Sequence, residues 1–207
     1  YIPDAFAALQ GTNVYMAGET AGSLDFFETA KRAALYVFPF VLGMSFLLLM
    51  VVFRSIVVPI KAVILNLLSI GATYGILVLA FQKGWGHKLG LLTEFDIIEA
   101  WIPLFLFTIL FGLSMDYHVF LLSRIRERFD QTGDNAGSVA YGLRTTAGII
   151  TGAALIMVAV FGGFAAGDLV MFQQVGFGLA VAVFLDATIV RSVLVPSTMK
   201  LLGDRNW

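Results

Sequence analysis

Apolar stretches long enough to cross a membrane dominate this chain. Three of them contain no Asp, Glu, Lys or Arg: residues 33–53, 62–81 and 145–167. Two more, residues 100–123 and 169–190, are each interrupted by one acid. A helix needs about 20 apolar residues to span the hydrocarbon core, and a backbone in lipid must satisfy its hydrogen bonds within its own segment. These runs therefore predict membrane helices, as do the 59% hydrophobic content and the mean hydropathy of +0.89.

The sequence predicts an all-α fold, a polytopic membrane bundle of five transmembrane helices at about 33–53, 60–81, 100–123, 145–166 and 169–190. Residues 1–32 are more polar, and 13–16 have the pattern of a short strand closed by a turn at Gly18. We interpret 1–32 as the end of an extracytoplasmic domain and 33–207 as the membrane domain, in a piece of a longer polypeptide. The segment 124–144 is predicted to be a solvated connector, with a short helix on the membrane surface as the alternative.

The distribution of Lys and Arg predicts how the chain lies in the membrane. Five spans place the two ends of the chain on opposite sides, and cytoplasmic segments are enriched in basic residues. One set of segments holds nine of the 13 basic residues, whereas the other holds only Lys31, Arg32, Lys83 and Lys88. We therefore predict a multi-pass protein of the cytoplasmic membrane, with the N-terminus outside and the C-terminus in the cytoplasm. A chance split of the basic residues is the alternative.

Residue types that are absent or few make several chemistries improbable. The chain has no cysteine and two distant histidines, so we expect no disulfide and no metal site. No basic stripe suggests nucleic acid as a partner. The sequence contains no phosphate-binding loop and no serine with a usable base, so we expect neither an enzyme nor a bound cofactor.

Two acids at bilayer depth carry the functional interpretation. An ionised carboxylate there costs roughly 2.5–3.5 kcal/mol, so Asp116 and Asp186 each need a reason for their position. Asp186 precedes Arg191 by five residues, which favours an ion pair that holds the helices together. Asp116 has no Lys or Arg within a helical turn, which favours a carboxyl that binds a proton from one side and releases it to the other. Both acids are predicted in the cytoplasmic half of their spans, at depths that permit contact.

Helical geometry suggests supporting roles for nearby polar residues. Ser123 shares the face of Asp116, whereas Tyr117 is rotated by about 100° and can donate its hydroxyl to a carboxylate on another helix. His118 points nearly away from Asp116, which makes it a poor relay partner and favours a place at a helix interface. Thr151, near the inner end of the fourth helix, can bond to an acid on a neighbouring helix. A bond to its own helix is the alternative.

The stretch GLSMDYHVFLLSRIRERF resembles the fourth-helix signature of one half of the mycobacterial membrane protein large family, within the resistance-nodulation-division superfamily. The similarity continues in AYGLRTTAGIITGAALIMVAVFGGFA and in LDATIVRSVLVPSTMKLLGDRNW, so it covers nearly the whole chain. The DYHVFLLSR form and the GDRNW ending resemble the C-terminal half. In such a half a large external porter domain precedes five helices, which implies that residues 1–32 are the end of an α/β porter domain.

The resemblance implies the C-terminal membrane half of an exporter of lipids or other hydrophobic compounds, driven by the proton gradient. Asp116 and Tyr117 match the family's Asp-Tyr pair, a proton relay that works with the matching pair of the other half. Asp186 and Arg191 match a recurrent pair on the last helix, whereas His118 stands where members often carry an acid. The expected partners are the missing N-terminal half, the porter domain, a lipid or other hydrophobic substrate and membrane lipids, and a homo-oligomer remains open.

Two other functions remain open at this stage. An accessory membrane subunit of protein export, from the same superfamily, has a similar membrane half and also uses protons. A membrane module similar to sterol-sensing domains would not transport at all, and its acids would only hold the helices together.

Overall fold

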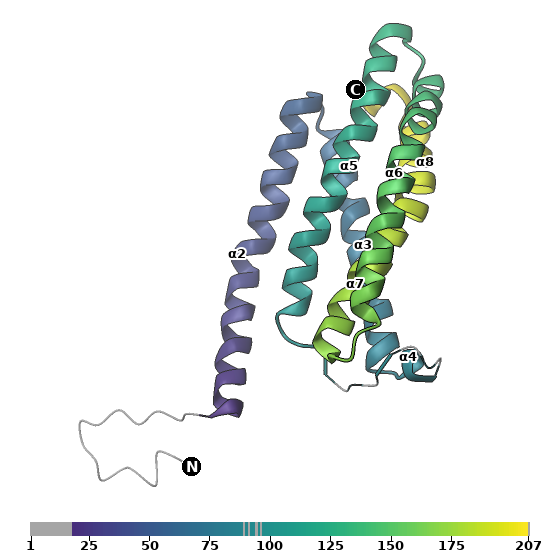
Figure 1. The fold of residues 1–207 in the computed structure, drawn as a ribbon. Coiled ribbons are helices and arrows are strands. Elements are labelled where there is room, and N and C mark those ends of the chain that lie inside the picture. The colour runs from purple at the N-terminus through teal and green to yellow at the C-terminus, as the bar shows by residue number, and fades with distance from the viewer. Residues whose placement is uncertain (1–17, 89, 91, 94, 96, 207) are drawn as a thin grey trace, which may run out of the picture.

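The computed structural model describes residues 18–88, 90, 92–93, 95 and 97–206. Over these residues the chain forms a bundle of long helices without strands (Figure 1). The elements are α2 (Glu19–Phe53), α3 (Val57–Phe81), α4 (Trp85–Lys88), α5 (Ile102–Thr132), α6 (Asn135–Ala165), α7 (Val170–Leu185), the π-helical η1 (Asp186–Leu194), α8 (Val195–Leu202) and the 3-10 turn η2 (Gly203–Asn206). Five helical stretches in the described residues have the length and hydropathy of membrane spans, and α7, η1 and α8 together make the last. The predicted all-α membrane bundle is confirmed.

The N-terminal segment is described only in part. The expected strand at 13–16 lies outside the described residues, and the domain boundary near residue 32 stays a prediction. From Glu19 onward the chain is helical and continues through Pro39 to Phe53 as α2. At 1.5 Å per residue α2 is about 52 Å long, well beyond the ~30 Å of a hydrocarbon core. Part of α2 must therefore extend out of the membrane.

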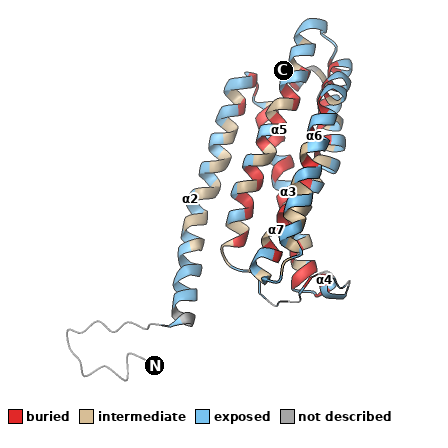
Figure 2. Ribbon diagram, viewed as in Figure 1, coloured by how far each residue is buried: buried red, intermediate tan, exposed pale blue. Residues whose placement is uncertain are grey.

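The centre of the bundle is made by α3, α5 and α7, with α2 and α6 at its sides. Buried residues concentrate on the central helices, whereas most of α2 and α6 is exposed (Figure 2). The α2–α3 turn, the α5–α6 turn and the C-terminus lie together, at what we call the C-terminal end of the bundle (Figure 1). The segments that hold most of the basic residues are thus gathered at one end.

The helices around the α5–α6 turn are longer than predicted, and the connector expected at 124–144 is wrong. α5 continues to Thr132, Gly133 takes the left-handed conformation with a φ of 67°, and α6 begins at Asn135. A prediction from apolar residues ends a span at the first charge, but charged residues remain helical when they pair at helical spacing. Such pairs join Arg124 to Glu127 at 2.8 Å and Arg126 to Asp130 at 2.9 Å.

A glycine on α7 allows α6 and α7 to approach closely. A Cβ at Gly176 would lie 2.6 Å from the carbonyl oxygen of Phe161 and 2.7 Å from the nitrogen of Ala165, both in the backbone of α6. The four-residue spacing of Gly148 and Gly152 has no such role among the described residues, since a Cβ at either position would meet open space there. Close backbone packing of this kind is a main source of helix association in lipid.

We predict that Gly176→Ala destabilises the bundle by about 1–3 kcal/mol, because the added methyl group meets backbone atoms that cannot rotate away. Thermal unfolding of the chain in detergent measures the effect as a lower melting temperature. Gly148→Ala, on α6 in open space, is the matched control and is expected to leave the melting temperature unchanged. Equal melting temperatures for the two variants would contradict the close contact between α6 and α7.

Candidate functional site

The last span changes its helical geometry where its two charged residues lie. η1 is π-helical, whereas α7 before it and α8 after it are α-helical. In an α-helix residues five apart differ in direction by about 140°, so Asp186 and Arg191 would not face each other. A π turn bonds residue i to residue i+5 and places Arg191 above Asp186. The span therefore passes beyond the predicted 169–190 and continues to Leu202 as one helical stretch.

Pro196, near the start of α8, gives a physical reason for the wide turn. Proline has no N–H to donate, and its ring clashes with the carbonyl one turn earlier in an α-helix. The turns before it are widened: the Val195 N–H bonds to the Val190 carbonyl, and the Ser192 hydroxyl bonds to the Ala187 carbonyl at 2.9 Å. Both bonds join residues five apart, as the pairing of the two charges requires.

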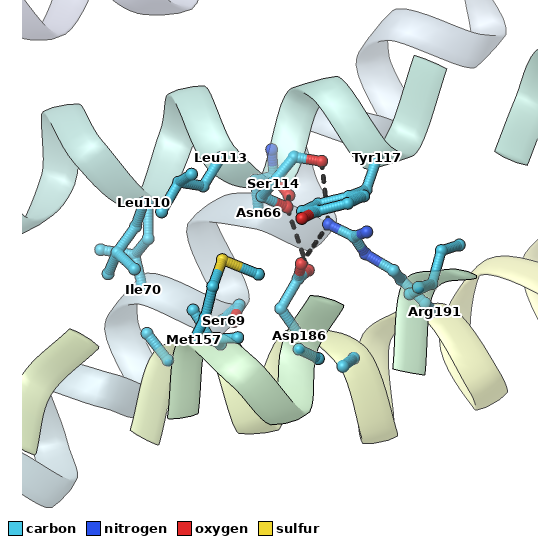
Figure 3. Close-up of a pocket in the computed structure, with 15 residues that line it drawn as sticks. Asn66, Ser69, Ile70, Leu110, Leu113, Ser114, Tyr117, Met157, Asp186 and Arg191 are labelled. Carbon is cyan, nitrogen blue, oxygen red and sulfur yellow. Dashed lines mark hydrogen bonds and ion pairs between the residues drawn. The ribbon is translucent and has the colours of Figure 1, made fainter. Parts of the chain in front are cut away.

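Asp186 and Arg191 form a buried ion pair that is tied to α5 (Figure 3). Their side chains are 12% and 4% exposed, respectively. Arg191 Nη2 donates to Asp186 Oδ2 and, at 3.0 Å, to the carbonyl oxygen of Ser114, while the Ser114 hydroxyl donates to Asp186 Oδ1 at 3.0 Å. A buried ion pair is tolerated only when its remaining donors and acceptors are bonded, and α5 supplies two of these bonds. The predicted pairing of the two residues is present in the structure.

Asn66 of α3 extends this network. Its Oδ1 lies 2.7 Å from the Ser114 hydroxyl. A hydroxyl has one proton, so Ser114 cannot donate fully to both Asn66 and Asp186. Turning the amide over lets its NH2 group donate to Ser114 and leaves the hydroxyl proton for Asp186. In either orientation, the polar atom of the Asn66 amide that points away from Ser114 has no hydrogen-bond partner among the described residues.

Tyr117 covers the ion pair and lines a small cavity beside it. The guanidinium carbon of Arg191 lies 4.7 Å from the centre of the Tyr117 ring, within range of a cation–π interaction. Tyr117, Asp186 and Arg191 line a cavity of about 30 Å³ between α3, α5, α6 and the last span, together with apolar side chains such as Ile70 and Met157 (Figure 3). A cavity of this size has room for about two water molecules.

Asp116 lies outside this network, on the exposed face of α5. Ser123 lies on the same face, as helical geometry predicted, and both Ser123 and Gly112 are exposed there. His118, on the opposite face, is fully buried. Within the described ranges Asp116 has no hydrogen-bond or ion-pair partner. Asp186 bonds to Ser114 and Arg191, and no hydrogen bond among the described residues joins the two acids. Asp116 therefore faces outward, whereas the adjacent Tyr117 faces the ion pair.

Thr151 is exposed on α6 and lines a separate hollow that also reaches Arg191. Sequence reasoning missed Asn66 and Ser114 as partners of the pair. A polar residue inside an apolar span is a usable signal for such a role, and Asn66 in the run ILNLL provides it. In the described part of the chain no group of three or more His, Asp or Glu residues is placed to hold a metal.

The fold and the site define a class: polytopic membrane proteins that keep ionisable residues inside a helical bundle at bilayer depth, where such residues mark ion and substrate pathways. The sequence pattern of the MMPL family matches residues 2–207. The chain belongs to the MMPL family and is a multi-pass membrane protein.

Curated relatives match over nearly the whole chain. The chain is 44% identical over 198 residues to the mycolic acid-containing lipids exporter MmpL11 of Mycolicibacterium smegmatis, covering 96% of this chain and 21% of that protein. It is 45% identical over 194 residues to the heme uptake protein MmpL11 of Mycobacterium tuberculosis, covering 94% and 20%. It is 38% identical over 207 residues to the trehalose monomycolate exporter MmpL3 of Mycolicibacterium smegmatis, covering 99% and 20%. The chain thus spans about a fifth of the length of these relatives.

Proposed function

We propose that this chain is the C-terminal membrane half of a proton-driven exporter of lipids or other hydrophobic compounds. The observation that carries the proposal is the position of Asp116, an acid on an exposed face of a membrane span with no partner in the described residues. Facing lipid, the ionised carboxylate would cost roughly 2.5–3.5 kcal/mol. We infer that another part of the transporter covers this face in the working protein.

The surface around Asp116 suits a second membrane helix. Gly112 lies one turn before Asp116, is exposed, and would have open space around an added Cβ, so a partner backbone can approach there. The occupant that we propose is the N-terminal half of the same transporter, with an Asp-Tyr pair of its own. Relatives about five times as long as this chain support this, because their length provides for that half and for a porter domain.

The names of the relatives support a hydrophobic cargo. Two of them are named as exporters, one of mycolic acid-containing lipids and one of trehalose monomycolate, and a third is named for heme uptake. Lipids and heme share a large apolar surface, although the direction of transport differs between the names. Export of a lipid across the cytoplasmic membrane, with the C-terminal end of the bundle in the cytoplasm, is the form that we propose for this chain.

In this mechanism Asp116 takes up a proton from one side and releases it to the other, and Tyr117 passes or orients that proton. The ion pair of Asp186 and Arg191 holds the Tyr117 ring in place through the cation–π contact of 4.7 Å. Moving one charge through 100 mV releases about 2.3 kcal/mol, which is available for conformational work. The proton gradient supplies the energy, so the mechanism requires no bound cofactor.

Tyr117→Phe tests the relay. We expect transport by the whole protein in liposomes with an imposed pH gradient to fall by about 100-fold, because the hydroxyl that carries the proton is gone. The melting temperature should not change, since the phenyl ring still covers Arg191.

Tyr141→Phe is the matched control for this experiment. Tyr141, on α6, also has an arginine over its ring, Arg128 at 5.2 Å, but it lies outside the site. We expect normal transport in this variant. Normal transport in Tyr117→Phe as well would remove the tyrosine hydroxyl from the mechanism.

A further inference from the structure

We propose that a chain of internal water connects the cavity at Asp186 with the C-terminal end of the bundle, and that buried polar side chains hold it, with His118 at its middle. One part of this inference rests on the proposed function: in the transporter, the water chain is the route on which protons pass between the site and that end. The hydration itself is a property of the fold and does not depend on transport.

Three neighbouring helical segments each carry two polar residues about one turn apart. The pairs are Asn66 and Lys61 on α3, Ser114 and His118 on α5, and Asp186 and Arg191 on η1. α3 runs away from the C-terminal end, while α5 and η1 run toward it (Figure 1). The members of the pairs nearer that end are therefore Lys61, His118 and Arg191. Five of the six residues are buried and Ser114 is half-buried. The packing therefore stacks two polar layers inside an apolar bundle.

A contact with the backbone of α5 links the two layers at the turn from Ser114 to His118. Arg191 Nη2 donates to the Ser114 carbonyl, which is also the carbonyl that the His118 N–H reaches in the α5 ladder. The guanidinium of Arg191, which belongs to η1, therefore lies level with the turn of α5 that joins Ser114 to His118. The imidazole lies close enough to both Arg191 and Lys61 for their charges to act on it.

Buried polar atoms that lack a hydrogen-bond partner lie along the path from the ion pair to Lys61. In the described part of the chain, the buried side-chain atoms that lack a hydrogen bond are Asn66 Nδ2, Arg191 Nε and both ring nitrogens of His118. Buried polar atoms of this kind are normally bonded to internal water. The cavity beside Asp186, which Asn66 and Arg191 line, has room for it, and the proposed chain continues from that cavity to His118. A neutral imidazole has one donor and one acceptor nitrogen, so His118 can bond to a water on each side and continue the chain.

Lys61 and the last described residue connect the line to the surface. Lys61 Nζ donates to Asn206 Oδ1 at 2.8 Å, and the Ser55 hydroxyl donates to the Asn206 carbonyl at 2.7 Å. Ser55 follows the exposed turn at Arg54, at the C-terminal end of the bundle. The line of polar groups thus runs from Asn66 and Asp186 through His118 to Lys61 and then to the end of the bundle.

Cysteine labelling tests the hydration. This chain has no cysteine, so a single cysteine placed in it is a unique reporter once cysteines elsewhere in the whole protein are replaced by serine. A small water-soluble methanethiosulfonate reacts with the thiolate, which forms only where water reaches the sulfur. We expect Ser69→Cys, in the cavity wall, and His118→Cys to react about tenfold faster than Ile125→Cys.

Ile125 is a demanding control because it is as buried as His118 and lies nearer the C-terminal end of α5, packed against Gly142 of α6. If distance from the surface set the rate, Ile125→Cys would react first. Labelling of Ser69→Cys and His118→Cys at or below the rate of Ile125→Cys overturns the water chain. Such a result would leave the proposed function standing if transport still required Asp116.

A second pair of variants tests the link to transport. His118→Phe fills the space and removes both ring nitrogens, whereas His118→Gln keeps a donor and an acceptor. We expect transport by the whole protein to fall about tenfold in His118→Phe and to stay near normal in His118→Gln. Normal transport in a folded His118→Phe would overturn the assignment of this water to the proton route. If His118→Phe does not fold, loss of transport in His118→Gln overturns that assignment instead.

Discussion

Arg191→Met is expected to destabilise the folded bundle by about 3–5 kcal/mol, because it leaves the Asp186 carboxylate buried without its charge partner. The Ser114 carbonyl would lose its second donor at the same time. Thermal unfolding in detergent should show a large drop in melting temperature, and the yield of folded protein should fall with it.

The double variant Asp186→Leu with Arg191→Met is the control. Replacing both charges by apolar side chains removes the unpaired carboxylate, and such replacements are often neutral or stabilising, so we expect most of the stability to return. Transport by this double variant then separates two roles of the pair. A stable but inactive protein would assign the pair to the transport mechanism, and a stable, active one would make it a scaffold. An unchanged melting temperature in Arg191→Met alone would contradict the buried ion pair.

Asp116→Asn is expected to reduce proton-driven transport by about 100-fold or more, because the amide cannot take up and release a proton. Expression and melting temperature should stay close to those of the unmodified protein, since asparagine has nearly the size and shape of aspartate and Asp116 has no ion-pair partner to lose among the described residues. The measurement is lipid transport by the whole protein in liposomes under an imposed pH gradient.

Thr108→Val provides a control on the same exposed face. Thr108 lies about two turns before Asp116, and its hydroxyl bonds to the Leu104 carbonyl of its own helix at 2.9 Å. We expect normal transport from this variant. If Asp116→Asn transports normally too, the acid has a structural role, and a membrane module without transport becomes the better interpretation.

The number and kind of helices could be predicted from the sequence because lipid imposes a strong constraint. A segment of about 20 apolar residues has few stable alternatives to a spanning helix. Helix ends are less constrained, since water outside the membrane tolerates both helix and loop. The run from Arg124 to Asp130 remains helical because of side-chain pairing, which a hydropathy pattern does not register.

The site was predictable to the extent that it depends on a single helix. The shared face of Asp116 and Ser123 and the opposite direction of His118 follow from 100° per residue, whereas the exposure of that face does not. The contact between Asp186 and Arg191 was expected from sequence spacing, but the π turn that makes it possible depends on how the last span packs. Contacts of Ser114 with Asn66, 48 residues away, arise only when α3 and α5 pack together. The sequence therefore could not show which of the two acids, Asp116 or Asp186, is buried in the bundle.

The buried ion pair of Asp186 and Arg191 also affects how the chain can be inserted into the membrane. The chain is synthesised from its N-terminus, so the span that carries Asp186 and Arg191 is the last of the five to reach the translocon. Alone in lipid, two charged side chains make insertion of that span unfavourable. By then the helices that bear Asn66 and Ser114 are already inserted, and they provide hydrogen-bond partners for the last span. The order of the spans along the gene thus matches the order in which their polar groups can be satisfied.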